Sequence, residues 1–331
     1  MCSSDLGLLV TGTHANRMLL EVTGHVEDVE RAFHIRLKRY RHPTEPRDFY
    51  APDAEPSVEE HLPVLDVSGL SDYGPPFPRL RRQTFSQPRF GSGSGGTYMG
   101  GDFRAAYLPG VNLTGAGQTL GLVQFDGFWL SDITNYTAHA GLPNVPVATV
   151  LLEGFDGIPV TDPGNSEVSM DIELAISMAT GLEKIICYEA GPYGAPNAVL
   201  NRMATDNQAR QLSCSWGWGG GPSATTDQIF QQMAAQGQSF FCASGDDGAY
   251  PPGSIDNPAL DNAPSDSAYI TVVGGTVLTT AGPGGARIGE TAWGNSGGGI
   301  SSFYSLPAWQ EGIEMSANCG SAAFPHLPDV A

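Results

Sequence analysis

Two acidic residues, Glu167 and Asp171, stand four positions apart in the stretch Ser166–Gly181. The stretch begins with a residue typical of a helix N-cap, ends on a glycine typical of a helix C-terminus, and is apolar around most of its circumference. Residues four apart lie on one face of a helix, so the two carboxyl groups repel each other when both are charged. One interpretation is a pair of solvent-facing acids favoured by the helix dipole. The other is a coupled pair that shares a proton and does acid–base chemistry.

A third acid, Asp246, follows the apolar run Phe240–Ala243 and stands between Gly245 and another aspartate. An aspartate in such a place commonly makes an Asx turn. Beyond residue 96 the sequence has two histidines, His139 and His326, so we expect carboxyl groups to carry out any acid–base chemistry there. Carboxyl groups exchange protons well below neutral pH, which favours a function in acid.

The net charge is unevenly distributed over the 331 residues. Residues 1–90 have a net charge of −2 and residues 91–331 one of −17, which together give the −19 of the whole chain. This acidity argues against nucleic acid as a partner, because phosphates repel it. It suits either acidic surroundings, in which self-repulsion fades, or simple solubility. No apolar run is long enough to span a membrane, and residues 1–6 lack the features of a signal peptide.

The elements that must position these acids follow from alternating apolar runs and helical patterns after residue 96. Strands are expected at Leu120–Phe125, Val147–Leu152, Lys184–Tyr188, Leu212–Trp216, Phe240–Ala243 and Ile270–Val273. Helices are expected at Ser131–Ala140, Ser166–Thr180, Ala195–Asn207 and Ser223–Gln236. This alternation predicts an α/β fold, a parallel sheet with helices on both faces, whose chemistry gathers beyond the carboxyl ends of the strands. Three cysteines inside these runs are predicted to be buried free thiols rather than disulfides: Cys187, Cys214 and Cys242.

The first 70 residues have the pattern of a small α+β domain. The expected elements are a strand at Arg17–Gly24, a helix at Val26–Phe33, a strand at Ile35–Tyr40, a helix opened by the capping box at Ser57, and a strand at Leu65–Leu70. Residues 71–96 are rich in proline, arginine and glycine, which predicts an exposed linker of the kind that proteases cut. The expected domains are therefore residues 1–70, the linker 71–96, and residues 97–331.

A basic cluster accompanies the third of these elements. It consists of Arg36, Lys38, Arg39 and Arg41. Because residues 91–331 are strongly acidic, we expect this cluster to dock on them rather than on nucleic acid.

One serine motif resembles a catalytic signature but has the wrong surroundings. Gly294–Gly298 fits the G-x-S-x-G pattern around Ser296. That pattern needs a strand before it and a helix after it, and here glycine and a strand-like segment follow. Ser296 is therefore predicted to be a turn residue.

Several motifs, taken in order, resemble one family. The segments SEVSMDIE, LSCSWGWG, CASGDDG, WGNSGGGISSFYSLPAWQ and the terminal PDVA are similar to those of the sedolisins, the serine-carboxyl peptidases, of the kumamolisin-like kind. The similarity runs from about Arg17 to the last residue. It implies a subtilisin-like fold, preceded by part of a ferredoxin-like activation pro-domain, and a secreted, monomeric endopeptidase zymogen that acts on proteins or peptides in acid.

The resemblance also implies roles for individual residues. Glu167 matches the general base that takes the proton of a nucleophilic serine, and Asp171 matches the partner of that base. Asp246 matches the protonated acid of the oxyanion hole. The segment Ser213–Gly219 is implied to bind substrate as an added strand, with Trp216 lining the cleft. The substrate-binding residues so implied are Ser213, Ser215, Trp216 and Gly217.

Two departures from the family pattern limit what this chain can do. The family's serine sits in a Gly-Thr-Ser motif after the Pro-Asp-Val-Ala segment, and no Gly-Thr-Ser occurs in these 331 residues. The sequence therefore predicts a fragment that cannot cleave peptides. The family's calcium site is implied to lie further along still, so calcium is expected for the longer protein, with no ligand here. Where some relatives have a supporting glutamate, this chain has Gln124, and Asp126 is a possible substitute.

A second function remains open from the sequence. A natural homologue without catalysis could keep the same fold as a peptide-binding or inhibitory module. An ordinary subtilisin is disfavoured, because its His-Gly-Thr-His motif is missing from residues 97–331.

Overall fold

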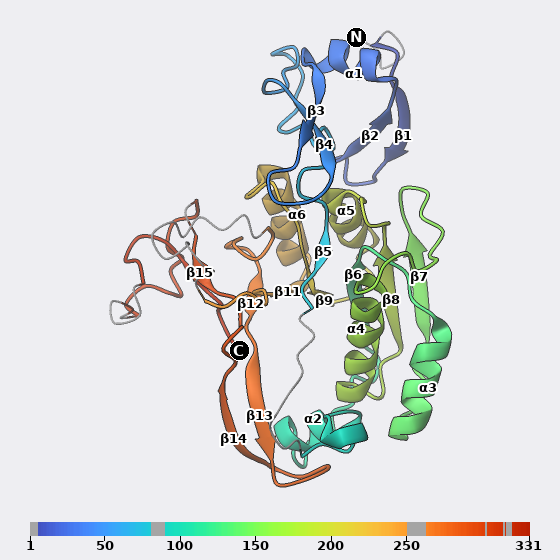
Figure 1. Ribbon diagram of the computed structural model, residues 1–331, viewed down its shortest axis with the longest axis vertical. Helices are drawn as coiled ribbons and strands as arrows, with labels where there is room; N and C mark the ends of the chain where they lie inside the picture. Colours follow the sequence, from blue (N-terminus) through green and yellow to red (C-terminus); the bar gives the residue numbers. More distant parts are fainter. Residues whose placement is uncertain (1–5, 81–89, 250–262, 302, 314, 316–319) are drawn as a thin grey trace.

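The structure is a computed structural model, and it describes residues 6–80, 90–249, 263–301, 303–313, 315 and 320–331. The larger part of it is built on a parallel sheet of six strands in the order β12-β11-β9-β6-β8-β7 (Figure 1). In chain order the strands are β6 (Thr119–Gln124), β7 (Val147–Leu151), β8 (Lys184–Glu189), β9 (Gln211–Cys214), β11 (Ser239–Ala243) and β12 (Thr271–Val273). All six predicted strands are confirmed.

Four helices follow the strands of this sheet and cover both of its faces (Figure 1). They are α3 (Leu130–Ala140), α4 (Gly164–Met178), α5 (Pro196–Asp206) and α6 (Ala224–Ala235). α3 packs against α4, and α5 packs against α6. The α/β fold with a subtilisin-like parallel sheet is therefore confirmed. Cys187, Cys214 and Cys242 are buried free thiols in its strands, as predicted.

Helix α4 begins two residues earlier than the sequence indicated. Pro163, rather than Ser166, precedes its first residue, and its last residue is Met178. The reason is the side chain of Asp126, which accepts hydrogen bonds from the backbone of Val160 at 2.7 Å and of Thr161 at 2.9 Å. These bonds hold the loop before the helix against the carboxyl end of β6, where the sheet carries its site.

The first 70 residues form a smaller unit of helix and strand. It contains β1 (Leu9–Thr13) paired with β2 (Leu20–Thr23), α1 (Val26–Phe33), and β3 (Leu37–Arg41) paired with β4 (Asp48–Pro52). The two pairs are separate two-stranded sheets. The small unit lies over α5 and α6 (Figure 1), where Asn16 Nδ2 donates to Asn201 at 2.6 Å and to Gln232 at 2.9 Å.

Two elements predicted in this unit are wrong. Residues 57–60 form no helix, although Ser57 opens a capping box, because Pro63 follows too soon for a second turn. Leu65–Leu70 is not a strand, and Gly69 takes a left-handed backbone conformation with φ of 83° that interrupts extended structure.

Within the part of the chain that the structure describes, the basic cluster makes its ion pairs inside the small unit and not with the acidic residues after 90, so the predicted docking is not found there. Each of its members pairs with an acid of its own unit. The ion pairs are Arg36 with Glu30, Lys38 with Asp53, and Arg39 and Arg41 with Asp48. The positive charges are therefore neutralised where they stand.

Of the remaining elements, the sequence indicated β10, at the end of the strand predicted at Leu212–Trp216, and the strand-like segment at β15, but not the others. The remaining elements are β5 (Phe77–Pro78), the 3-10 turn η2 (Ser94–Gly96), α2 (Gly101–Tyr107), β10 (Trp216–Gly217), the hairpin β13 (Thr276–Thr280) with β14 (Arg287–Ala292), and β15 (Gly299–Ile300) with β16 (His326–Leu327). Among the described residues, no helix combines the length and the apolar character needed to cross a membrane.

Candidate active site

Glu167 and Asp171 lie on α4, beside the carboxyl ends of the central strands. Glu167 is buried, with 1% of its surface exposed, so the solvent-facing interpretation of this acid is wrong. Its Oε2 atom is buried and has no hydrogen-bond partner among the described residues. Leaving a buried acceptor unpaired costs about 1 to 3 kcal/mol, so an orphan oxygen of this kind commonly marks a functional position.

Asp171 is held by side chains from two neighbouring strand ends. The hydroxyl of Ser215 donates to its Oδ1 at 2.7 Å, and Gln124 Nε2 donates to its Oδ2 at 2.8 Å. Gln124 in turn accepts from the indole nitrogen of Trp216 at 2.8 Å. Gln124, noted in the sequence as a departure, is thus the direct support of Asp171. Asp126 instead holds the loop before α4.

Burial and mutual repulsion raise the proton affinity of the pair. Burial is the largest cause that raises the pKa of Glu167, and the charges of Asp171 and Asp246 raise it further. Burial also raises the pKa of Asp171, against the hydrogen bonds from Ser215 and Gln124, which lower it. The pair therefore retains a proton at pH values where exposed carboxyl groups have lost theirs.

Asp246 lies in the turn that follows β11, close enough to Glu167 for its charge to act there. That turn is fixed by contacts of the two residues just before Asp246. The amide of Gly297 donates to the carbonyl of Gly245 at 2.5 Å, and the hydroxyl of Ser244 donates to Gly297 at 2.8 Å. The structure thus brings the three acids singled out in the sequence into one place.

An extended segment of the chain already lies along this site. Strand β5 pairs antiparallel with β10, with Pro78 opposite Trp216 and Phe77 opposite Gly217 (Figure 1). The pairing is extended at both ends, because the amide of Arg79 donates to Ser215 at 2.8 Å and that of Gly219 to Gly74 at 3.0 Å. β5 also contacts α4. Residues 74–79, expected to be exposed linker, form an added strand segment beside the paired acids, with β5 at Phe77–Pro78 and single hydrogen bonds at its two ends.

The implied substrate-binding residues take different places. Gly217 and the backbone of Trp216 form β10, the strand that holds β5. The ring of Trp216 is 2% exposed and packs edge-on against Phe125 at 5.6 Å, so only its backbone lies along the edge. Ser215 contributes its carbonyl to the edge and its hydroxyl to Asp171. Ser213 lies in β9, paired on one side with β6 and on the other with β11.

Ser296 is a turn residue, as predicted. Its amide donates to Trp293 at 2.9 Å, and its hydroxyl accepts from the amide of Gly275 at 2.8 Å. It holds the start of the β13–β14 hairpin rather than a position among the acids.

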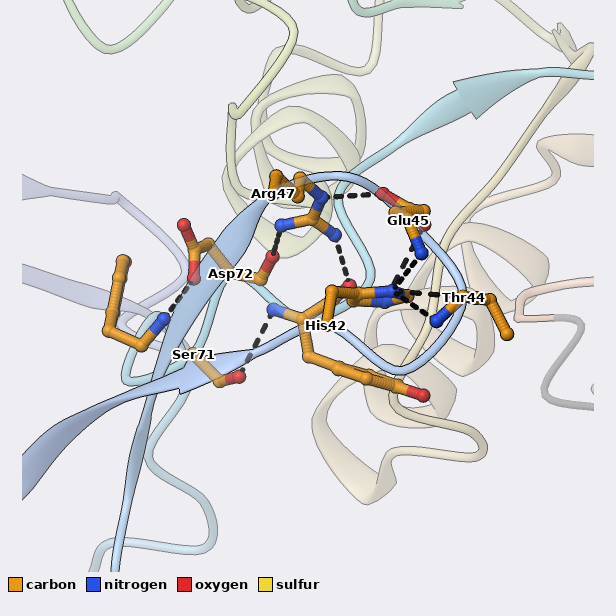
Figure 2. A network of polar contacts seen from close by, with 8 residues as sticks. His42, Thr44, Glu45, Arg47, Ser71 and Asp72 are labelled. Carbon is orange, nitrogen blue, oxygen red and sulfur yellow. Dashed lines mark hydrogen bonds and ion pairs between the residues drawn. The ribbon is translucent and has the colours of Figure 1, made fainter.

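A polar network in the small unit fixes the start of the added strand. Figure 2 shows Arg47 reaching the backbone of residues 72 and 73, with distances of 2.8 Å to the carbonyl of Asp72 and 2.6 Å to that of Tyr73. The carboxylate of Asp72 accepts from the amide of Tyr50 at 2.6 Å. Residues 71–73 are thereby attached to β4, and the chain enters the site from a fixed point.

No metal site can be assigned to the residues present. In the described ranges, no three His, Cys, Asp or Glu side chains gather closely enough to hold an ion.

Arg79, which the sequence analysis placed in the linker, also belongs to the site. Its side chain is 7% exposed, and its Nη1 atom donates to the carbonyl of Ala243 at 2.6 Å. The available signal was an arginine directly after a proline-rich extended segment, which is the composition of a peptide that binds as a strand.

This chain is similar to one known domain over its first part and to known proteins over nearly its whole length. Residues 5–73 match the family described as Pro-kumamolisin, activation domain. Kumamolisin from Bacillus sp. (strain MN-32) is 29% identical over 98% of this chain, and Sedolisin from Pseudomonas sp. (strain 101) is 28% identical over 96% of it. The chain spans 62% and 58% of the length of these two relatives.

A solved structure agrees with these matches. Pseudomonas sedolisin (serine-carboxyl proteinase), complexed with two molecules of pseudo-iodotyrostatin, superposes with a TM-score of 0.57 at 28% identity. The superposition covers 69% of this chain and 68% of that one. The activation-domain match, the alignments over nearly the whole chain and the shared fold agree, and all of them make the chain similar to the sedolisins, of the kumamolisin-like kind.

Proposed function

We propose that the protein is a secreted, monomeric serine-type endopeptidase of the serine-carboxyl kind, which acts in acid and is made as a zymogen. The observation that carries this proposal is the buried Oε2 atom of Glu167, which has no hydrogen-bond partner among the described residues. The Glu167 side chain lies beside Asp171 and near Asp246. Beside these acids the edge of β10 holds an extended segment of the chain. The substrates would be proteins or peptides bound along that edge.

In this proposal the three acids divide the proton transfers among them. Glu167 takes the proton of a serine hydroxyl as the serine oxygen attacks the peptide carbonyl, and returns it to the leaving amine. Asp171 holds Glu167 in position and tunes its proton affinity. Asp246, when protonated, donates a hydrogen bond to the carbonyl oxygen as negative charge develops there. Water then releases the acyl group by the same route in reverse.

The raised pKa of Glu167 bears on the inhibited state of such a zymogen. A general base must be deprotonated before it can accept the proton of the serine. Burial is the largest cause of the raised pKa, and β5 contacts the helix that carries the pair. We infer that removal of β5 admits water, lowers the pKa of Glu167, and makes the base available in acid.

The nucleophile is not among the 331 residues, so the proposal is tested on a longer protein. The coding sequence would be extended to include a Gly-Thr-Ser motif, and hydrolysis of a peptide would be followed from pH 3 to 8. We expect an acidic optimum, and a fall of roughly 10²- to 10³-fold in kcat for Asp246→Ala. Asp246→Asn keeps a donor at every pH, so the alkaline limb of its profile should extend upward. Asp247→Asn, one residue away, is the matched control.

A Glu167→Gln variant with undiminished kcat would overturn the proposed role of the base. The runner-up function, a peptide-binding or inhibitory homologue without catalysis, is favoured by the strand already bound at β10. A stop codon in place of the Gly-Thr-Ser sequence would support that second function.

A further inference from the structure

The side chain of Arg79 occupies a built site at the end of the added strand. Its guanidinium donates to the carbonyl of Ala243, the last residue of β11, just before the chain segment that leads to Asp246. Two glycines make room for it. A Cβ atom at Gly217 would come within 2.7 Å of the Arg79 Nε and Nη2 atoms, and one at Gly245 would lie 3.5 Å from Nη1. The backbone thus closes around this side chain.

A buried segment that contains an acid runs along the other side of β10. The amide of Trp218, just after β10, donates to the carbonyl of Ala263 at 3.0 Å. Three residues further along this segment, Asp266 is 5% exposed. The charges of Arg79 and Asp266 both act on the thiol of Cys242: its pKa is lowered chiefly by the hydrogen bond with Cys214, and then by Arg79, against burial and Asp266. A cation and an anion are therefore buried around one thiol.

We propose that this place, formed by β10, the carbonyl of Ala243, Gly245 and Asp266, is a specificity site for a basic side chain in peptide substrates, and that Arg79 occupies it as a substrate arginine does. The inference rests on the proposed function and names the substrate class that the function acts on. A buried guanidinium needs hydrogen-bond acceptors and a compensating negative charge, which in this proposal come from the Ala243 carbonyl and Asp266, whereas an aliphatic side chain can use neither. The site is therefore selective for arginine.

The same placement orients the peptide bond that follows the arginine. The backbone amide of Arg79 donates a hydrogen bond to the carbonyl of Ser215, and its guanidinium donates one to the carbonyl of Ala243. The backbone of the residue and the tip of its side chain are therefore both fixed. The bond to Leu80 follows this fixed residue on its carboxyl side. In this proposal peptides are cut after the basic residue, and the Arg79–Leu80 bond is the corresponding bond of this chain.

Hydrogen exchange on the whole 331-residue chain tests the site without any catalysis. Arg79→Met keeps the length of the side chain and removes its charge. We expect the amides of residue 79 and Gly219, which report detachment of the added strand, to exchange roughly 10- to 100-fold faster in Arg79→Met. Amides of β6 should be unchanged, and Arg39→Met, an exposed arginine of the small unit, is the matched control. Equal exchange in Arg79→Met and the original chain would overturn the inference.

A second experiment tests the same inference by measuring the substrate preference of the extended protein. Peptides with arginine or with citrulline, its uncharged isostere, before the cleaved bond would be compared by kcat/KM. We expect arginine to be preferred roughly 10- to 100-fold, and the preference to fall in Asp266→Asn and in Gly217→Ala. Cleavage with no preference between the two peptides would overturn the specificity site and leave the peptidase intact. Absence of all cleavage, together with faster exchange in Arg79→Met, would instead overturn the peptidase and keep a binding site for basic peptides.

Discussion

The indole nitrogen of Trp216 donates to Gln124 Oε1 at 2.8 Å, and this bond decides which way the Gln124 amide faces. With its oxygen engaged by the indole, the amide presents its nitrogen to Asp171, also at 2.8 Å. A side chain buried behind the sheet edge therefore controls a donor at the site. A motif residue that the resemblance placed in the cleft acts here through its neighbour.

Trp216→Phe should destabilise the protein by about 1 to 3 kcal/mol, because it leaves the buried oxygen of Gln124 without its donor. The amide is then free to rotate and to turn its oxygen toward Asp171. Urea unfolding at pH 5 measures the loss. Trp218→Phe is the control, since that ring also packs on Phe125, at 6.0 Å. Equal losses in the two variants would mean that ring volume, rather than the indole hydrogen bond, matters.

Stability should fall as pH rises from about 4 to about 8, and Glu189 is one identifiable cause. It lies 1% exposed at the end of β8, and burial raises its pKa from the ordinary 4.5 to about 8. A raised pKa means that the folded protein holds a proton that the unfolded chain has released. The stabilisation is therefore complete below pH 4 and is lost as pH rises through about 8, by an amount on the order of 2 to 4 kcal/mol.

Glu189→Gln should flatten this dependence, because an amide has no proton to lose. Unfolding free energies at pH 4, 6 and 8 would be compared with those of Glu183→Gln, at an exposed position just before β8. A slope unchanged by Glu189→Gln would show that this carboxyl group contributes nothing to it.

Glu167→Gln should stabilise the chain at pH 7 and leave its stability at pH 3.5 nearly unchanged. The original carboxyl group is neutral in acid, and near neutrality it resists ionisation beside Asp171 and away from water. The substituted amide carries no charge at either pH. Thermal unfolding at the two values measures the difference. Destabilisation at pH 7 would indicate that the charged form of Glu167 is favourable in the fold.

Arg47→Met should detach the start of the added strand without unfolding either unit. The side chain holds two consecutive backbone carbonyls, those of Asp72 and Tyr73. Without these bonds the amide of Tyr50, which donates to Asp72, should exchange roughly tenfold faster. Arg41→Met, which loses an exposed ion pair with Asp48, should have little effect. Unchanged exchange at Tyr50 would show that Asp72 is held by other contacts.

The central sheet could be predicted from the sequence because each strand is a near-continuous apolar run between helical patterns. Short elements could not. α2 follows Gly100, a residue with φ of 52°, and no side-chain hydrogen bond caps its start. The hairpin β13–β14 contains Gly289 and Thr276 amid other polar residues, so it lacks the apolar alternation that marks a strand. Its pairing depends on tertiary contacts such as that of Tyr107 with Glu290.

The acids of the site could be predicted for a related reason. Two like charges one turn apart on an apolar helix conflict with local physics, and such conflicts commonly indicate function. Arg79 offers no such local signal. Its burial depends on β10 and on Ala243, which lie more than 130 residues away in the chain. A long-range pairing of two residues per strand leaves no periodic pattern to detect.

At the far end of the added strand, Gly74 and Gly219 meet backbone to backbone: a Cβ atom on Gly74 would lie 2.6 Å from the Gly219 Cα. Any polypeptide that binds along the same edge of β10 must therefore have a small residue at this position, five residues before the arginine. A bulky side chain there would lift the incoming chain off β10, whatever followed it. Cleavage sites in foreign proteins should therefore show a preference at two positions, a small residue and, five residues later, a basic residue, rather than at the basic position alone.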